Sequence, residues 1–491
     1  MKLIDLINNK DLSNNDINIS GLSENSRNVK KNYIFFFKSS KNSKEKYIIE
    51  AIKKGAILII YEKNKSLNIK KFKNKCLFYG VDDISRTMSN ISKKFYNTNI
   101  GSFRIYGITG TNGKSSVVNL ISQLLKLNGI KCGVIGTLGS GIFPRIVNQN
   151  LTTPNIINIC KNVDNFNKKN ITNLAIEVSS HGLTQKRIEG LSFDTVIFTN
   201  LSKEHMDYHK NMQNYYQAKL KLFTEYTSRR KIICIDTYYG KKIYNLVKSN
   251  KSTLSVSLKN NKADFYASKI SFTENGTKFM INSKYGSKEI NTSFYGEYFI
   301  TNILLSIAIL AKSKKEFILY TSKLCKLVSV DGRLNKYWRK NYPIIFIDYA
   351  HTPDALKKSL FSIKKHFPKR NITSIFGCGG DRDIKKRKIM GQIADKFSNK
   401  VIITNDNPRS EDPAKIAKQI ISGINKKSNY QVILDRRKAI KKSISKDYSN
   451  EVILVFGKGH EKTQILKNKV LNFSDKKEVL EALSKKWVNI L

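Results

Sequence analysis

The sequence of 491 residues has no apolar run that approaches the roughly 20 residues of a membrane-spanning helix. The opening stretch, 1–7, is not followed by a long apolar core and a small-residue cleavage site, so no export signal is predicted. The six cysteines are scattered without a C-x-x-C pair, which argues against a disulfide framework or a zinc cluster. These absences favour a cytoplasmic protein with reduced thiols and no membrane span.

Acidic residues are also few, because 38 Asp and Glu stand against 88 Lys and Arg, for a formal charge of +50. Such a charge usually indicates nucleic acid or an anionic membrane as the partner. Here the lysines are spread over every segment beside abundant asparagine and isoleucine, with no basic tail and no basic patch interleaved with aromatic residues. We therefore expect a compositional bias and an anionic small-molecule substrate, with no nucleic acid. A basic, nucleic-acid-dependent ATPase is the alternative from a different class.

A nucleophile set is missing as well. No Ser-His-Asp or Cys-His arrangement and no pair of acid and base carboxylates can be recognised, so hydrolysis through a covalent enzyme intermediate is poorly supported. What is present is the composition of a folded protein, with 40% hydrophobic and 10% aromatic residues. The length suggests about three domains, each able to bury a core.

A glycine-spaced loop organises the chain. The apolar run 103–108 is typical of a buried parallel strand, and apolar residues at helical spacing follow over 117–125. Between them, Gly110 and Gly113 allow the backbone to approach phosphate oxygens at a helix N-terminus. Lys114 can reach the β and γ phosphates, and the Ser115 hydroxyl can bind Mg²⁺. The spacing matches the shorter G-x-x-G-K-S form of a phosphate-binding loop.

Three α/β domains are predicted at 1–98, 99–325 and 326–491. The first is small, with strands at 33–37 and 56–61 and a helix at 85–96. The second is a parallel-sheet domain around the phosphate loop. Its strands are expected at 103–108, 132–136, 174–181 and 195–200, and its helices at 212–226 and 298–312. A β insertion is expected at 252–295, with a hairpin at Asn275-Gly276. The third is doubly wound, with strands at 343–348, 372–377, 400–405, 430–434 and 451–456.

Polar residues follow the strands of the second and third domains. In an open parallel sheet, ligands lie outside the carboxyl ends of the strands, so these loops are expected to converge on the phosphate site. Ser115, Glu177 and His205 are oxygen and nitrogen ligands suited to Mg²⁺. In the third domain, four strands are followed by polar residues, and we call these stretches decorated ends. They indicate a ligand crevice and lie at 348–353, 377–383, 406–409 and 457–461.

Together these motifs resemble the Mur ligase family, the ATP-dependent ligases that build the peptidoglycan stem peptide. The matching stretches occur in the family's order through the chain; they are 107–115, 177–183, 199–202 with His205, 216–219, 332–333 and 348–351. The resemblance implies a UDP-binding first domain, a central domain like a P-loop ATPase, and a Rossmann-like last domain that binds an amino acid.

Within the family, the chain looks most like the ligase that adds a diamino acid to UDP-N-acetylmuramoyl-L-alanyl-D-glutamate. The stretch Asp406-Asn-Pro-Arg409 matches the pattern associated with meso-diaminopimelate. The resemblance implies that the D-glutamate γ-carboxylate attacks ATP to form an acyl phosphate, which the diaminopimelate amine then attacks. Such a C–N ligase would need ATP and Mg²⁺, and would serve cell wall biogenesis, cell shape and cell division. A monomer is expected.

The resemblance also assigns roles to individual residues. Lys114, Glu177, His205 and Lys219 are implied as the catalytic group, with Ser115, Glu177, His205 and Lys219 around the metal. Nucleotide contacts are implied for Gly110, Thr111, Asn112, Gly113, Lys114, Ser115, Ser116, Asn302, Arg333 and Asp348. Contacts with the UDP-muramoyl dipeptide are implied for Ser26, Thr152, Thr153, Ser179, Gln185 and Arg187. Diaminopimelate contacts are implied for Arg382, Asp406, Asn407, Pro408, Arg409, Gly457 and Glu461.

The diaminopimelate assignments agree with the chemistry, because an amino acid with two zwitterionic ends needs a guanidinium for carboxylate and an acid for ammonium. Lys219 is implied to be a carbamylated lysine, in which CO₂ turns a cation into an anionic Mg²⁺ ligand. By pattern alone, Lys219 is one solvated lysine among many.

Some positions depart from the family pattern. Ser115 and Ser116 stand where threonines are usual, which preserves the hydroxyl ligand. The stretch 40–42 reads Ser-Lys-Asn where the family often has His-Gln, so Ser26 is the one uridine contact assigned in the first domain. The same reaction with L-lysine is the nearest alternative. Folylpolyglutamate synthesis on the same scaffold is disfavoured by the 406–409 stretch and by the UDP-type first domain.

Overall fold

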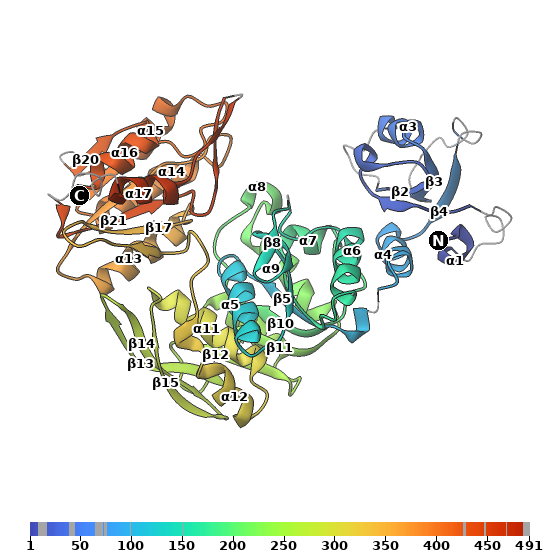
Figure 1. The fold of residues 1–491 in the computed structure, drawn as a ribbon, viewed down its shortest axis with the longest axis horizontal. Helices are drawn as coiled ribbons and strands as arrows, with labels where there is room; N and C mark the ends of the chain where they lie inside the picture. Colours follow the sequence, from blue (N-terminus) through green and yellow to red (C-terminus); the bar gives the residue numbers. More distant parts are fainter. Residues whose placement is uncertain are drawn as a thin grey trace.

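The computed structural model describes residues 1–7, 17–38, 45–63, 72, 76–98, 100–149, 151–425, 429–445, 448–467 and 469–484. Three lobes follow one another along the chain, each built around its own sheet (Figure 1). The stretch 40–42, which departs from the family pattern, lies outside the described residues. Among the helices of the described ranges, none is long and apolar enough to cross a membrane.

The first lobe holds a four-stranded parallel sheet in the order β1-β2-β3-β4. Its elements are α1 (Leu3–Leu6), β1 (Gly21–Ser23), the 3-10 turn η1 (Ser26–Asn28), β2 (Tyr33–Phe37), α3 (Lys46–Lys53), β3 (Ala56–Glu62), β4 (Leu77–Val81) and α4 (Ile84–Phe95). The two predicted strands and the predicted helix are confirmed as β2, β3 and α4. Helix α4 begins where the Asp83 carboxylate accepts hydrogen bonds from the Ser85 and Arg86 N–H groups, at 2.9 and 3.0 Å.

The second lobe holds an eleven-stranded sheet in the order β15-β14-β13-β12-β11-β10-β5-β9-β6-β7-β8. Its strands are β5 (Arg104–Thr109), β6 (Cys132–Gly136), β7 (Gly139–Ile142), β8 (Arg145–Val147), β9 (Asn173–Glu177), β10 (Phe193–Phe198), β11 (Ser228–Cys234), β12 (Thr253–Ser257), β13 (Phe265–Thr273), β14 (Gly276–Ser283) and β15 (Gly286–Thr292). Strand β5 lies between β9 and β10 and is parallel to both. The loop after β5 is therefore flanked by the polar ends of both neighbours.

The predicted β insertion forms part of this sheet. Strand β12 pairs in parallel with both β11 and β13. Strands β13, β14 and β15 then form an antiparallel meander. The hairpin at Asn275-Gly276 is confirmed, with Thr273 paired to Gly276 across the turn. Because the pairing is continuous, the meander lengthens the central sheet on the β11 side.

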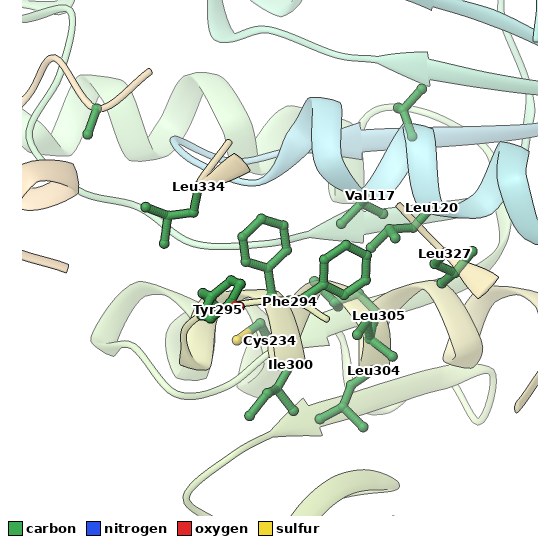
Figure 2. Packing of buried hydrophobic residues seen from close by; sticks show 14 of the residues in the cluster. Val117, Leu120, Cys234, Phe294, Tyr295, Ile300, Leu304, Leu305, Leu327 and Leu334 are labelled. Carbon is green, nitrogen blue, oxygen red and sulfur yellow. The ribbon is translucent and has the colours of Figure 1, made fainter. Parts of the chain in front are cut away.

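Helices cover the central sheet (Figure 1). They are η3 (Ile100–Ser102), α5 (Lys114–Leu127), α6 (Ile156–Asn167), α7 (Ser180–Thr184), α8 (Met206–His209), α9 (Met212–Thr224), α10 (Tyr238–Val247), α11 (Glu297–Leu310), α12 (Lys314–Thr321) and η4 (Leu324–Lys326). Figure 2 shows Val117 and Leu120 of α5 close to Leu305 of α11, in one buried cluster. This packing fixes α11 beside the helix that begins at the phosphate loop.

The third lobe holds a six-stranded sheet in the order β16-β17-β21-β18-β19-β20, parallel except for β16. Its elements are β16 (Asn335–Tyr337), β17 (Ile344–Asp348), α13 (Pro353–His366), β18 (Asn371–Phe376), α14 (Lys385–Phe397), β19 (Lys400–Ile403), α15 (Pro413–Ile421), β20 (Tyr430–Val432), α16 (Arg436–Ser443), β21 (Glu451–Phe456), the β22 (Thr463–Leu466) and β23 (Lys469–Asn472) hairpin, and α17 (Asp475–Ser484). All five predicted strands are confirmed. The four decorated ends follow adjacent parallel strands and so share one edge of the sheet.

A buried ion pair joins α16 to α17. The Arg436 guanidinium contacts both Asp475 carboxylate oxygens at 2.7 Å and donates to the Phe456 carbonyl at 2.8 Å. Both side chains of the pair are fully buried. The neighbouring Arg437 is 54% exposed and pairs with Glu478, which Lys441 also contacts at 3.2 Å.

Arg436→Met should therefore destabilise the third lobe by about 3–5 kcal/mol, because it leaves a buried carboxylate without its cation. Arg437→Met should cost less than about 1 kcal/mol, because its side chain is solvated and Glu478 keeps Lys441. Urea unfolding followed by circular dichroism would measure both. Equal losses in the two variants would contradict this assignment.

Candidate functional site

The carboxyl end of β10 holds the phosphate loop in place. The Thr111 N–H donates to the Asn200 carbonyl at 2.8 Å, and the Asn112 N–H donates to the Asn200 side-chain oxygen at 3.0 Å. The Thr199 hydroxyl donates to the Asn112 carbonyl at 2.6 Å. Thr199 and Asn200 were not among the predicted site residues, although the stretch 199–202 was part of the family pattern. Their role depends on the β5–β10 pairing, which the sequence does not show.

Two lysines meet at the start of this loop. The Lys114 ammonium donates to the carbonyls of Gly110 and Thr111 at 2.9 and 2.8 Å, and Lys219 of α9 donates to the same Gly110 carbonyl at 2.8 Å. Lys219 is 1% exposed and lies 4.7 Å from the centre of the Tyr215 ring. The interpretation of Lys219 as a solvated lysine is therefore wrong, because the fold buries this face of α9.

Burial has a chemical consequence for Lys219. Desolvation of the ammonium, together with the nearby charge of Lys114, lowers the Lys219 pKa well below its ordinary value. A lowered pKa favours the neutral amine. The neutral amine is the form of lysine that acts as a nucleophile.

Glu177 ends β9 beside the phosphate loop. Its carboxylate accepts hydrogen bonds from the Thr137 N–H at 2.8 Å and the Thr137 hydroxyl at 3.1 Å, and it is 1% exposed. Ser115, in the first turn of α5, is also buried. Among the described residues, no hydrogen bond or ion pair joins Glu177 to Ser115, His205 or Lys219.

A hydroxyl and a carboxylate suit Mg²⁺, which commonly takes one or two protein ligands and completes its shell with water and phosphate. The Glu177 oxygens each keep a second lone pair, so the contacts with Thr137 do not block coordination. Lys219 as an amine donates a hydrogen bond here, whereas a carbamate would offer oxygen ligands. Ser115 and Glu177 thus fit the metal as they are, and Lys219 would fit it only as a carbamate. The described residues contain no group of three or more His, Cys, Asp or Glu side chains arranged for a metal.

Glu204 joins the second lobe to the third. Its carboxylate lies 3.8 Å from the His205 Nε2 atom and 3.7 Å from the Nε2 atom of His351, which follows β17. Burial alone would raise the Glu204 pKa, but the contact with His351 and the charges of His205 and Lys114 lower it to about 2. The Asn112 side chain makes a second bridge, donating to Asp354 of α13 at 3.4 Å.

His205 directly precedes α8, and its side chain, which is 45% exposed, lies in a cluster of aromatic rings. Its ring centre is 5.0 Å from that of His181, and the His181 ring is 4.1 Å from that of Tyr208. Burial lowers the pKa of His205 and of His181, so both rings tend to be neutral. A neutral imidazole is the form that binds metals.

The residues assigned to the UDP-muramoyl dipeptide form a connected network in the second lobe, except for Ser26. Thr153 donates to the Glu177 carbonyl at 2.8 Å and contacts the Ser179 hydroxyl at 3.1 Å. Arg187 donates to the Thr153 carbonyl at 2.9 Å and to the Gln185 side-chain oxygen at 2.6 and 3.0 Å. Thr152 contacts the Thr137 hydroxyl at 3.1 Å. Ser26 lies in the first lobe, where it donates to Glu50 at 2.6 Å.

The three nucleotide residues outside the loop come from two lobes. Asn302 of α11 faces Gly113, since a Cβ at Gly113 would lie 2.6 Å from the Asn302 Oδ1 atom. Asp348 ends β17, is fully buried, and accepts the N–H groups of Leu334 and Ala350 at 3.0 and 2.7 Å. Burial raises the Asp348 pKa to about 6. The Arg333 guanidinium lies 4.8 Å from the centre of the Tyr349 ring.

The residues assigned to diaminopimelate gather at the shared edge of the third sheet. Asn407 donates to the Glu461 carboxylate at 3.0 Å, and a Cβ at Gly457 would lie 2.5 Å from an Asp406 carboxylate oxygen. The half-buried Arg409 has a left-handed backbone, φ 52°, and donates to the Gly380 carbonyl at 2.6 Å. It is anchored to β22 through its N–H, which donates to Ile465 at 3.1 Å.

Two further residues of this set lie at its margin. The side chain of Arg382 is exposed, and a Cβ at Gly379 would lie 3.7 Å from the Arg382 Cγ atom and 3.0 Å from the Arg409 Nη1 atom. Both arginines therefore flank the same glycine. The Pro408 backbone lies against Gly380, whose N–H donates to the Asn407 carbonyl at 2.9 Å. Pro408 thus shapes the loop by its backbone.

Comparison with known proteins shows which families and structures this chain resembles. Residues 108–310 match the family described as the Mur ligase middle domain, and residues 332–459 match the Mur ligase glutamate ligase domain. The UDP-N-acetylmuramoyl-L-alanyl-D-glutamate--2,6-diaminopimelate ligase of Wigglesworthia glossinidia brevipalpis is 40% identical over 94% of each chain. A solved structure of a ligase with the same name covers 99% of each chain at 27% identity, with a TM-score of 0.71.

A more distant structure shares the fold. The MurF ligase from Thermotoga maritima, solved in complex with ADP, is 16% identical and covers 97% of this chain and 100% of its own, with a TM-score of 0.62. The predicted three-domain α/β fold is confirmed by these neighbours and by the three sheets. From the family matches and the full-length relative, the chain belongs to the Mur ligase family.

Proposed function

We propose that this protein is an ATP-dependent ligase that joins meso-diaminopimelate to the D-glutamate γ-carboxylate of UDP-N-acetylmuramoyl-L-alanyl-D-glutamate, in peptidoglycan synthesis. The observation that carries the proposal is the full-length similarity to ligases of that name, at 40% identity. The site residues support it, because the lobe with the phosphate loop is joined to the lobe with the Asp406–Arg409 loop. The joining contacts are those of Asn112 with Asp354 and of Glu204 with His351.

In the first step, the γ-carboxylate attacks the γ-phosphate of ATP, forming an acyl phosphate and releasing ADP. Positioning and charge neutralisation dominate phosphoryl transfer, so a protein nucleophile is not required. The N–H groups at the start of α5 and the Lys114 ammonium would bind the phosphates. The acceptor would be held next to Glu177, whose backbone carbonyl accepts a hydrogen bond from Thr153. The residues that would hold it are Thr152, Thr153, Ser179, Gln185 and Arg187.

In the second step, an amine of diaminopimelate attacks the acyl carbon, a C–N bond forms, and phosphate leaves. Arg409, with Arg382 beside it, would bind a carboxylate of the amino acid, and Glu461 would bind an ammonium. Asn302, Arg333 and Asp348 would contact the nucleotide from the side of α11 and β17.

Ser115, Glu177, His205 and a carbamylated Lys219 would hold Mg²⁺. The ion would neutralise the phosphate charge when bound. The buried, neutral-favoured amine of Lys219 supports the modification, because CO₂ reacts with an uncharged amine. We further propose that the domain boundaries lie at about residues 98 and 325, and that the first domain binds UDP through Ser26. The protein would act as a monomer in the cytoplasm.

A product assay tests the proposed reaction. The purified protein would receive ATP, Mg²⁺ and the UDP-muramoyl dipeptide, with meso-diaminopimelate, L-lysine or no amino acid, and mass spectrometry would identify the product. We expect a tripeptide product and ADP with diaminopimelate. A product with L-lysine alone would show that the amino acid is wrong, and ATP turnover driven only by nucleic acid would show that the reaction class is wrong.

A glycine substitution tests the phosphate loop. Gly113 precedes α5 at φ 89°, so Gly113→Ala should lose about 1–2 kcal/mol of stability from the left-handed backbone. Its Cβ would also crowd Asn302, which should raise the KM for ATP about tenfold by displacing loop N–H groups. Gly129→Ala is the matched control, since it has φ 75° beyond the other end of α5 with nothing within 4 Å. A raised ATP KM in both variants would contradict the prediction.

A further inference from the structure

Lys458 occupies the centre of the amino-acid site, although the sequence drew attention only to its neighbours Gly457 and Glu461. The side chain follows β21 and is 0% exposed. Its ammonium donates to the Asn407 Oδ1 atom at 3.0 Å and to the Glu461 Oε2 atom at 2.8 Å. Since the Asn407 amide also donates to Glu461 Oε2 at 3.0 Å, the three side chains form a closed triangle.

The triangle restricts how the two substrate-facing side chains can turn. Asn407 is held at both ends of its amide, because its Oδ1 atom also accepts the Ile465 N–H at 3.0 Å. The Oε2 atom of Glu461 is held by Lys458 and Asn407, whereas the Oε1 atom makes no hydrogen bond or ion pair with the described residues. The Glu461 side chain is 31% exposed, so a ligand can reach it. Burial alone would raise the Glu461 pKa, but Lys458 outweighs burial and lowers it, so the carboxylate is ionised.

Charge in this region is also set by Lys458. Arg436 is paired with Asp475, and Lys458 is paired with Glu461. Without Lys458, Glu461 would add an unbalanced negative charge near the buried Asp406. An amino acid of net charge +1, such as L-lysine, would gain more from that change than diaminopimelate, which is neutral overall.

We propose that Lys458 is a positioning residue that selects a diamino dicarboxylic acid over a diamino monocarboxylic acid, a role that rests on the proposed function. Its ammonium fixes Asn407 and one oxygen of Glu461, so that the other oxygen is oriented for a substrate ammonium. It also cancels the carboxylate charge that would otherwise attract a cationic amino acid. Lys458 acts through these two side chains and takes no part in phosphoryl transfer.

The test uses Lys458→Met, which keeps the unbranched side chain up to the Cε atom and removes the ammonium. Loss of a hydrogen-bonded charge should lower kcat/KM for diaminopimelate about 10- to 100-fold, mainly through KM. The kcat/KM for L-lysine should fall less. The ratio of kcat/KM for diaminopimelate to kcat/KM for L-lysine should therefore fall at least about fivefold. Lys462→Met is the matched control, because Lys462 is exposed and only four residues away. It should change neither value.

Two measurements separate positioning from a general loss of structure. Hydroxylamine would trap the acyl phosphate, forming a C–N bond as phosphate leaves, and the hydroxamate yield with ATP and the dipeptide should be the same in Lys458→Met and wild type. In a Glu461→Gln background, Lys458→Met should cost much less than in the wild type, because the two residues act together. A wild type that yields no hydroxamate would contradict the proposed function itself.

The outcomes are then distinct. A normal hydroxamate yield with a reduced preference for diaminopimelate supports the proposal. An unchanged preference with a normal yield overturns it. An equal fall in hydroxamate yield and in both kcat/KM values also overturns it, since the residue would then be purely structural.

Discussion

Lys219→Gln is expected to lower the kcat of ligation by about 10²- to 10³-fold, the range measured when one preorganised electrostatic contact is removed. The Gly110 carbonyl, which Lys219 contacts at 2.8 Å, also accepts from Lys114 at 2.9 Å, so the phosphate loop should keep its shape. Glutamine cannot form a carbamate and cannot provide an anionic ligand beside Lys114. Steady-state ADP release with all three substrates would measure the effect.

A residue on the same helix provides the control. Lys221 is 40% exposed and pairs with Glu225, so Lys221→Gln should keep wild-type activity. Carbon-13 NMR in labelled bicarbonate should show a carbamate signal in the wild type that disappears in Lys219→Gln. Full activity of Lys219→Gln, or a signal that persists in it, would show that Lys219 is not the modified residue.

Arg409→Met should raise the KM for diaminopimelate by about 100-fold, because it removes a guanidinium that can bind a carboxylate through two hydrogen bonds. The KM for ATP should stay within about twofold, since Arg409 lies in the third lobe, away from the phosphate loop. Methionine is a matched replacement for the backbone, because any side chain other than glycine meets the same strain at φ 52°. Initial rates over a range of each substrate would separate the two KM values.

The choice between amino acids sharpens this test. If Arg409 reads the second carboxylate of diaminopimelate, Arg409→Met should lose the preference over L-lysine, which lacks that group. Arg437→Met, an exposed arginine on α16, should retain it. If Arg409→Met keeps the preference for diaminopimelate over L-lysine, another residue must determine specificity. Lys458 would be the first residue to test.

Most of the fold could be predicted, because its strands are short apolar runs in a polar background. The runs at 132–136 and 451–456 coincide with β6 and β21. Two strands of the first lobe were missed. Strand β4, Leu-Phe-Tyr-Gly-Val, is a short run that is only half-buried, and β1 has three residues. The order of the strands in each sheet could not be predicted either, because strand pairing depends on residues that are distant along the chain.

The sequence alone determined where the glycine-spaced loop at 110–116 and the polar strand ends lie, because residue type and spacing are local features. The environment of each side chain was decided by the tertiary structure. The buried amine of Lys219, the bridge from Glu204 to His351, and the triangle around Lys458 all join residues that are distant along the chain or belong to separate elements. Burial and charge pairing depend on which elements pack together, so a lysine that looks solvated in the sequence can be buried in the site with a lowered pKa.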